Sequence, residues 1–162
     1  MWTATEPFDF DGRWYRLRGA ICEPKPVQRP SPPILIGAGG DRSLRIVAEH
    51  ADIWNCPTRG DVDEFRRLSA ILDVHCATIG RDPREIVRSV QFIVTAPGSP
   101  AAQPGLPRFA DPAATRDLLL DFVDAGASHL VLAPALTDVD RPVRWLADEI
   151  VEPVREQLPQ QA

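Results

Sequence analysis

The chain has 162 residues, of which 44% are hydrophobic and 25% charged, and this composition is ordinary for one globular domain. The net charge is -5 and the basic residues are not clustered, which argues against nucleic acid as a partner. The 3 cysteines do not resemble a secreted disulfide framework, and the first residues lack the features of a signal peptide. No apolar run approaches the roughly 18 residues of a membrane span, so we expect a cytoplasmic protein without membrane contact.

The beginning of the chain differs in pattern from the rest. Phe8 to Leu17 alternates around Asp11 and Gly12, a dipeptide typical of a hairpin turn. Residues 23–33 are so rich in proline that they predict an extended segment and exclude a helix. Such a segment could bind a recognition domain such as SH3, but a connector is the interpretation we favour. We expect one domain, with the hairpin and connector in residues 1–32, an α/β part in 33–157 and a tail in 158–162.

From residue 33 onward, apolar strands alternate with amphipathic helices. The predicted strands cover residues 34–36, 51–55, 87–94 and 129–133, and the predicted helices cover 41–50, 61–80, 111–126 and 141–157. Residues 96–110 are predicted to form a long loop. This alternation indicates a parallel sheet of the α/β class. The pattern fits either a small open sheet with helices on both faces or about four β/α units of an eight-stranded barrel.

The first candidate for a binding site follows the first of these strands. Gly37, Gly39 and Gly40 allow a sharp turn, and Asp41 begins a helix whose unpaired N–H groups favour an anion. The segment lacks the Gly-Lys-Ser/Thr end of a P-loop and the last glycine of the dinucleotide fingerprint. It therefore predicts a phosphate-binding turn, with a plain tight turn as the alternative.

A second candidate loop follows the next strand. In the segment from Asn55 to Gly60, Thr58 and Arg59 could supply a hydroxyl and a guanidinium to the same phosphate, because functional loops of (β/α) barrels lie at the carboxyl ends of the strands. The alternative is a surface turn with a solvated Arg59. No cysteines or histidines have the spacing of a metal site, and His129 is expected to be structural.

Several segments, in this order, resemble luciferase-like monooxygenases, and more closely their coenzyme F420-dependent branch. These segments are residues 10–17, 22–30, 32–40, 51–55, 79–83 and 122–126. The resemblance implies a (β/α)8 TIM barrel in which the cofactor phosphate lies near the loops after the fifth and sixth strands. On the matching positions here, the backbone of Gly39, Gly40 and Asp41 would bind the phosphate, and Asn55, Thr58 and Arg59 would form the neighbouring wall.

Members of this family transfer a hydride between substrate and deazaflavin, or use reduced flavin with oxygen. The resemblance therefore implies coenzyme F420 as cofactor, with FMN as the alternative. A family member is roughly twice as long as this chain. The resemblance covers the carboxy-terminal half of such a family member. We therefore expect a partial barrel without the first four β/α units, from a truncated, split or deliberately isolated gene product. The catalytic residues would lie mainly in the other half and are not identified.

A partial barrel would expose apolar surface. We expect uncovered inward side chains at Ile34, Ile36, Ile53, Phe92, Val94, Leu130 and Leu132. A homo-oligomer, pairing with a separately encoded amino-terminal half, or marginal stability would follow. Two further functions remain open: a non-catalytic half-barrel that binds a ligand or a subunit, and a complete small doubly wound protein that binds a nucleotide.

Overall fold

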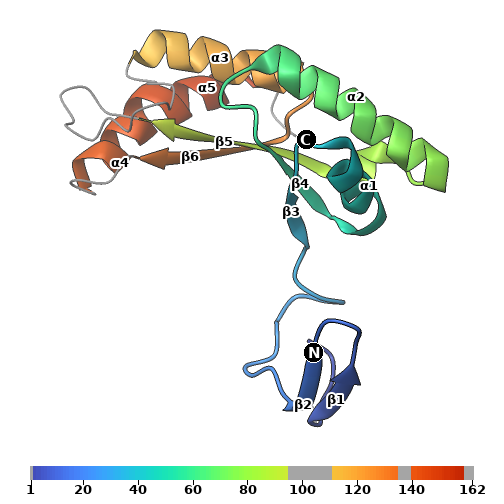
Figure 1. Ribbon diagram of the computed structural model, residues 1–162. Helices are drawn as coiled ribbons and strands as arrows, with labels where there is room; N and C mark the ends of the chain where they lie inside the picture. Colours follow the sequence, from blue (N-terminus) through green and yellow to red (C-terminus); the bar gives the residue numbers. More distant parts are fainter. Residues whose placement is uncertain (1, 95–110, 135–139, 159–162) are drawn as a thin grey trace. The chain divides into compact units, whose positions relative to one another are not determined.

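The computed structural model describes residues 2–94, 111–134 and 140–158. Contacts divide the chain into two compact units, Met1–Ile34 and Leu35–Ala162 (Figure 1). The predicted loop at 96–110 and most of the predicted tail lie outside the described residues. Within the described part of the chain, no helix is both long and apolar enough to cross a bilayer.

The first unit contains the predicted hairpin. Strands β1 (Phe8–Asp11) and β2 (Arg16–Ala20) are antiparallel, with a register irregularity between Phe8 and Phe10. The turn is closed by a hydrogen bond from the N–H of Gly12 to the carbonyl of Tyr15, 2.9 Å long. Residues 23–33 form neither helix nor strand, as the prolines predict.

The second unit is built on a parallel sheet. Its strands are β3 (Leu35–Gly37), β4 (Ile53–Cys56), β5 (Val87–Val94) and β6 (His129–Pro134). They lie side by side in chain order, β3-β4-β5-β6, and the helices between them cover one face of the sheet (Figure 1). A doubly wound sheet reverses its strand order and carries helices on both faces, so that alternative is wrong for the described residues. The sheet does not close, and the arrangement is that of a partial (β/α)8 barrel.

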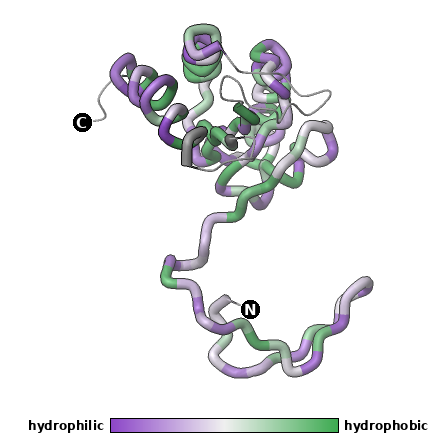
Figure 2. The backbone as a smooth tube through the Cα atoms, turned by 90° about the vertical axis from the view of Figure 1, so that its left-hand side faces the viewer, coloured by the Kyte–Doolittle hydropathy of each residue, from purple (hydrophilic) through white to green (hydrophobic). Residues whose placement is uncertain are grey.

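The helices begin and end where local sequence signals place them. Helix α1 spans Asp41–His50, α2 spans Val62–Ile79, a 3-10 turn η1 spans Pro83–Glu85, and α3 spans Pro112–Asp124. The side chain of Asp61 caps α2 by accepting from the N–H of Glu64 at 2.9 Å, and Asp111 caps α3 in the same way. Gly80 ends α2 with a φ of 72°, a conformation that glycine adopts without strain. In Figure 2 the helices alternate between hydrophilic and hydrophobic stretches, as expected when one side packs on the sheet.

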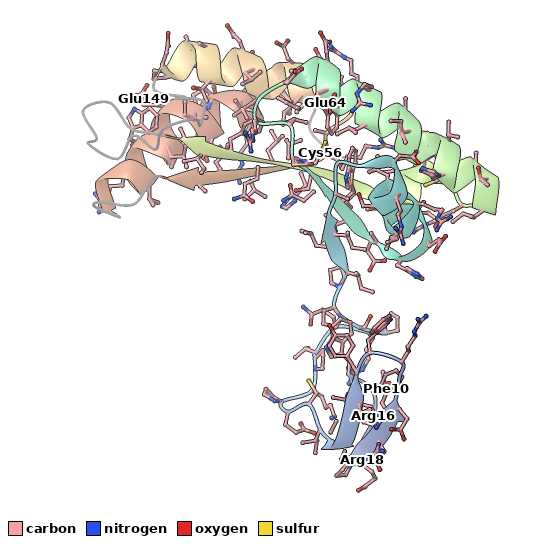
Figure 3. The ribbon with its side chains drawn as sticks, in the orientation of Figure 1. Phe10, Arg16, Arg18, Cys56, Glu64 and Glu149 are labelled. Atoms are coloured by element: carbon pink, nitrogen blue, oxygen red, sulfur yellow. The ribbon has the colours of Figure 1, made fainter. Side chains whose placement is uncertain are left out.

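The last predicted helix contains a wider turn that the sequence analysis did not predict. Helix α4 (Asp140–Leu146) continues through a π-helical segment η2 (Ala147–Val151) into α5 (Glu152–Gln157). In a regular helix the carbonyl of Glu149 would accept from the N–H of residue 153, but Pro153 has none. Arg116 of α3 donates to this carbonyl at 2.7 Å, so a neighbouring helix satisfies the group that proline leaves unpaired (Glu149 is labelled in Figure 3).

The core between the sheet and the helices contains a chain of aromatic rings. Trp54 stacks on Phe65 with ring centroids 5.9 Å apart, and the edges of Phe65 and Phe92 meet Phe122 at 5.5 and 5.1 Å. Trp54 is fully buried, and its Nε1–H donates to the carbonyl of Ala38 at 2.8 Å. One side chain thus joins the aromatic core to the loop after β3.

The expected set of uncovered side chains is largely wrong. Phe92 and Val94 are 2% and 1% exposed, and Ile36, Leu130 and Leu132 pack against the same buried cluster under the helices. Two members agree with the expectation: Ile34 is 40% exposed, and Ile53 lies on the opposite face of the sheet, in register with Leu35 and Val87, which are 50% and 39% exposed. Successive strand residues point to opposite faces, so assigning the wrong parity moves a whole set of side chains to the other side.

The hydrogen bond of Trp54 generates a stability prediction. Trp54→Phe keeps an aromatic ring against Phe65 but leaves the buried carbonyl of Ala38 without its donor. We expect the free energy of unfolding to fall by about 1–3 kcal/mol, measured by urea denaturation followed through helical circular dichroism. Trp14→Phe is the matched control, because Trp14 is 78% exposed, and it should leave the urea midpoint unchanged. Equal effects of the two substitutions would contradict an anchoring role for the indole N–H.

Candidate functional site

Two loops meet at the carboxyl ends of β3 and β4. The first loop comprises residues 38–40 and the second comprises residues 57–60. Gly37 lies in register with Asn55, and the N–H of Ala38 donates to the carbonyl of Asn55 at 3.3 Å. Together with the Trp54 indole, this bond holds the first loop against β4.

The contact between the two loops explains one of the predicted glycines. A Cβ atom added to Gly39 would lie 2.9 Å from Cγ of Pro57, closer than side chains normally approach. The same addition to Gly40 would meet Ser43 Oγ at 3.6 Å, an ordinary contact. Gly39 is therefore required by its neighbour, whereas Gly40 is not restricted by space.

The start of α1 offers hydrogen-bond donors. In the described part of the chain, the backbone N–H groups of Gly39, Asp41 and Arg42 have no hydrogen-bond partner. The N–H of Gly40 instead donates to the hydroxyl of Ser43 at 3.2 Å, and that hydroxyl donates back to the carbonyl of Gly40 at 2.8 Å. The positive end of the helix dipole adds to the attraction for an anion. A ligand at Gly40 would have to replace the Ser43 hydroxyl.

The side chain of Asp41 pairs with a histidine and is not suited to binding an anion. Its carboxylate lies 3.0 Å from Nε2 of His75 on α2. A carboxylate repels an anionic ligand, so only the backbone N–H of Asp41 suits the predicted function.

The second loop has an uncommon backbone conformation. Arg59 has a φ of 52° and Gly60 has a φ of 94°. The turn is held by hydrogen bonds from the N–H of Thr58 to the carbonyl of Cys56 and from the N–H of Asp61 to the carbonyl of Thr58. Thr58 is 7% exposed, whereas Arg59 is exposed and forms no ion pair with any residue that the structure describes. A left-handed residue other than glycine stores strain, and such residues are frequent in ligand-binding turns.

Asn55 lies apart from the other predicted residues. Its register position places its side chain on the face of the sheet that the helices leave uncovered, beside Ser89 of β5. Its Oδ1 is buried and has no hydrogen-bond partner within the described residues. Ser89 in turn contacts His129 of β6, with 2.9 Å between Oγ and Nδ1.

This row of Asn55, Ser89 and His129 was not predicted as a unit. The three residues occupy paired positions on adjacent strands. The sequence could have indicated the row only through polar residues at matching positions of three separate strands, and that comparison requires the register. His129 has the structural contact that we expected, but it is also exposed.

Cys56 lies close to the second loop but is unsuited to nucleophilic chemistry. Burial, with a smaller contribution from Glu64, raises the pKa of its thiol from 9.0 to about 12, against the opposing effect of Arg67 and Arg88. Figure 3 shows Cys56 on β4 beneath α2, which carries Glu64. Since the thiolate is the reactive form, Cys56 is a packing residue at neutral pH. The described residues bring together no group of three side chains that could hold a metal ion.

Comparisons with known proteins agree with this geometry. The family model of luciferase-like monooxygenases matches residues 1–128. The chain belongs to the luciferase-like monooxygenase family. The resemblance inferred from the sequence motifs is thereby confirmed, and so is a parallel α/β sheet similar to that of the family's barrel enzymes.

Individual relatives of this luciferase-like chain include one curated protein and several solved structures. The FMNH(2)-dependent dimethylsulfone monooxygenase of Pseudomonas putida is 30% identical over 118 residues, which are 65% of this chain and 32% of that protein. The coenzyme F420-dependent tetrahydromethanopterin reductase of Methanopyrus kandleri has a TM-score of 0.69 at 14% identity, covering 92% of this chain and 58% of that one. An F420-dependent secondary alcohol dehydrogenase, in complex with an F420-acetone adduct, has a TM-score of 0.64 at 15% identity, covering 94% and 57%. The luciferase-like chain thus spans less than two thirds of the length of each relative.

The loop contact generates a matched pair of substitutions. Gly39→Ser places a Cβ atom against the Pro57 ring, so the two loops must separate, at an expected cost of about 1–3 kcal/mol in the free energy of unfolding. Gly40→Ser fits the available space, and serine is a good helix N-cap, so its urea midpoint should not decrease. If both variants unfolded at the same urea concentration, the loops would not be in the contact described.

The raised pKa of the Cys56 thiol can be tested by alkylation. Iodoacetamide at pH 8 should modify the half-buried Cys22 in the folded protein and leave Cys56 unmodified until urea unfolds the chain, as measured by peptide mass spectrometry. Because the folded thiol keeps its proton between pH 9 and about 12 while the unfolded thiol loses it, Cys56 lowers stability as pH rises through this range. Rapid alkylation of Cys56 in the folded chain would contradict the raised pKa.

Proposed function

We propose that this chain binds the phosphate of a flavin or deazaflavin cofactor in a luciferase-like oxidoreductase. The start of α1 carries the proposal, because the N–H groups of Gly39 and Asp41 have no partner in the described part of the chain and lie at the positive end of a helix. The guanidinium of Arg59, which forms no ion pair with any described residue and lies in the loop after the neighbouring strand, supports it. Both features suit a phosphate group, which needs several N–H donors and a positive charge.

The residues divide by the kind of contact they could make. Gly37 and Gly39 bring the backbone of the first loop into position, and Gly40 could donate once Ser43 is replaced. The Thr58 hydroxyl and the Arg59 guanidinium would complete the phosphate contacts, while Asn55 would lie on the face of the sheet opposite to the helices. A bound cofactor would supply the redox chemistry, which is hydride transfer for a deazaflavin and reaction with oxygen for a reduced flavin. We assign no catalytic residue to this chain.

We favour coenzyme F420, with FMN as the alternative. Two of the fold relatives are described as F420-dependent, whereas the curated relative is described as FMNH(2)-dependent. The proposed contacts are to the phosphate, which both cofactors carry, so the cofactor ring is chosen by residues outside these two loops.

A second candidate function is a non-catalytic half-barrel that binds another subunit. The uncovered face of the sheet favours it, because Leu35 and Val87 expose apolar surface there. The two candidates agree that the chain works with another barrel half, either a second copy or a separately encoded amino-terminal half.

The proposed function is tested by fluorescence titration of the chain with coenzyme F420 and, in parallel, with FMN. We expect saturable binding that inorganic phosphate weakens by competition. Arg59→Gly is the informative variant, because glycine adopts the observed φ of 52° easily and the turn should survive the loss of charge. Its affinity should fall about tenfold or more, since hydrogen bonds to charged groups contribute about 1.5–3 kcal/mol.

The control for Arg59→Gly is Arg66→Ala, on the exposed side of α2. Alanine replaces this arginine because glycine would weaken the helix. It removes the same charge from a surface ion pair with Asp63 and should leave the affinity unchanged. If neither cofactor binds, or if the two arginine variants lose equal affinity, there is no phosphate site in these loops. The subunit-binding function would then remain.

A further inference from the structure

The first residue of α1 carries two groups that act on an anion in opposite ways. The backbone N–H of Asp41 has no hydrogen-bond partner within the described ranges and lies at the positive end of the helix dipole. The carboxylate of the same residue is negative and 79% exposed, so it repels an anion bound at that N–H. The charge that surrounds this carboxylate therefore affects how tightly the start of α1 holds an anion.

The carboxylate of Asp41 faces a histidine on the neighbouring helix. Nε2 of His75 in α2 lies 3.0 Å from Oδ1 of Asp41. Because a carboxylate only accepts hydrogen bonds, Nε2 carries the hydrogen, and Nδ1 is the atom that gains a second proton. Nδ1 forms no hydrogen bond with any described residue, and the side chain is 19% exposed, so water can deliver this proton. The pair can thus hold a neutral or a charged imidazole without losing its hydrogen bond.

The other charged groups that face His75 come from α1. The ring lines an open pocket of about 410 Å³ together with Asp41, Arg42 and Arg45. The two guanidinium groups oppose protonation of the ring, whereas the carboxylate, which is in direct contact, favours it. Arg45 is also drawn toward Glu49, 3.8 Å away. On α2 itself, the residues three and four positions from His75 are uncharged.

We propose that protonation of His75 raises the affinity of the start of α1 for an anion, because the imidazolium neutralises the carboxylate of Asp41. This inference rests on the proposed phosphate site and concerns its regulation by pH. Histidine side chains gain a proton as the pH falls between about 8 and 5, so the anion should bind more tightly at the lower pH. A bound anion should in turn favour the charged form of His75, since coupling between two sites is mutual.

The test uses sulfate, whose double negative charge is constant over this pH range, and follows the amide NMR signals of Gly39 and Asp41 in the full chain. We expect the affinity for sulfate to be about threefold to fivefold higher at pH 5.5 than at pH 8, as expected when one nearby charge is neutralised in a solvent-exposed site. At pH 6.5, added sulfate should move the imidazole signals of His75 toward their protonated positions.

Three variants separate the charge of His75 from its hydrogen bond. His75→Gln retains a donor for Asp41 but has no charge, so its affinity for sulfate should be low at both pH values. His75→Lys is charged at both pH values, so its affinity should be high at both. His50→Gln, at the other end of α1, is the matched control and should keep the pH dependence of the unaltered chain.

The outcomes distinguish this inference from the function on which it rests. If the amide signals respond to sulfate with the same pH dependence in the unaltered chain and in His75→Gln, control by His75 is wrong and the proposed phosphate site stands. If the signals of Gly39 and Asp41 do not respond to sulfate at either pH, the phosphate site and its regulation are both wrong.

Discussion

The buried indole of Trp54 is the interaction on which the candidate site depends. Its ring stacks on Phe65 in the core, and its N–H holds the carbonyl of Ala38 in the loop that precedes α1. Because the loop is fixed at this carbonyl, Gly39 is brought against Pro57 of the neighbouring loop. The turn that we propose as the phosphate site is thus held in position by the packing of the core beneath it.

Elements controlled by neighbouring residues could be predicted from the sequence, whereas elements controlled by distant residues could not. Asp61, Gly80 and Asp111 act within one helical turn, so the limits of α2 and α3 followed from local capping. The π-helical segment depends on Arg116 of another helix, and the face on which Phe92 lies depends on strand register. Parallel strands carry apolar residues at successive positions, so hydrophobicity does not reveal which side the helices cover.

The candidate site shows the same division. The glycines of the first loop were visible in the sequence, but only the structure distinguishes Gly39, which is restricted by Pro57, from Gly40, which is not. The family resemblance grouped Asn55 with Thr58 and Arg59 as one wall of the cofactor site. The structure places Asn55 in a row across the sheet with Ser89 and His129, and its assignment to the cofactor wall stays a prediction. Such a row is defined by three strands and has no counterpart in a linear motif.

The contact between Arg116 and the carbonyl of Glu149 has a consequence for sequence variation. Arginine at 116 serves a carbonyl that proline at 153 leaves without an N–H donor, so the two positions compensate each other although they lie on different helices. Among related proteins, we expect proline at the position of Pro153 to occur together with a long donor side chain at the position of Arg116. Where that proline is replaced, the side chain at the position of Arg116 has no unpaired carbonyl to satisfy. The two positions should therefore covary.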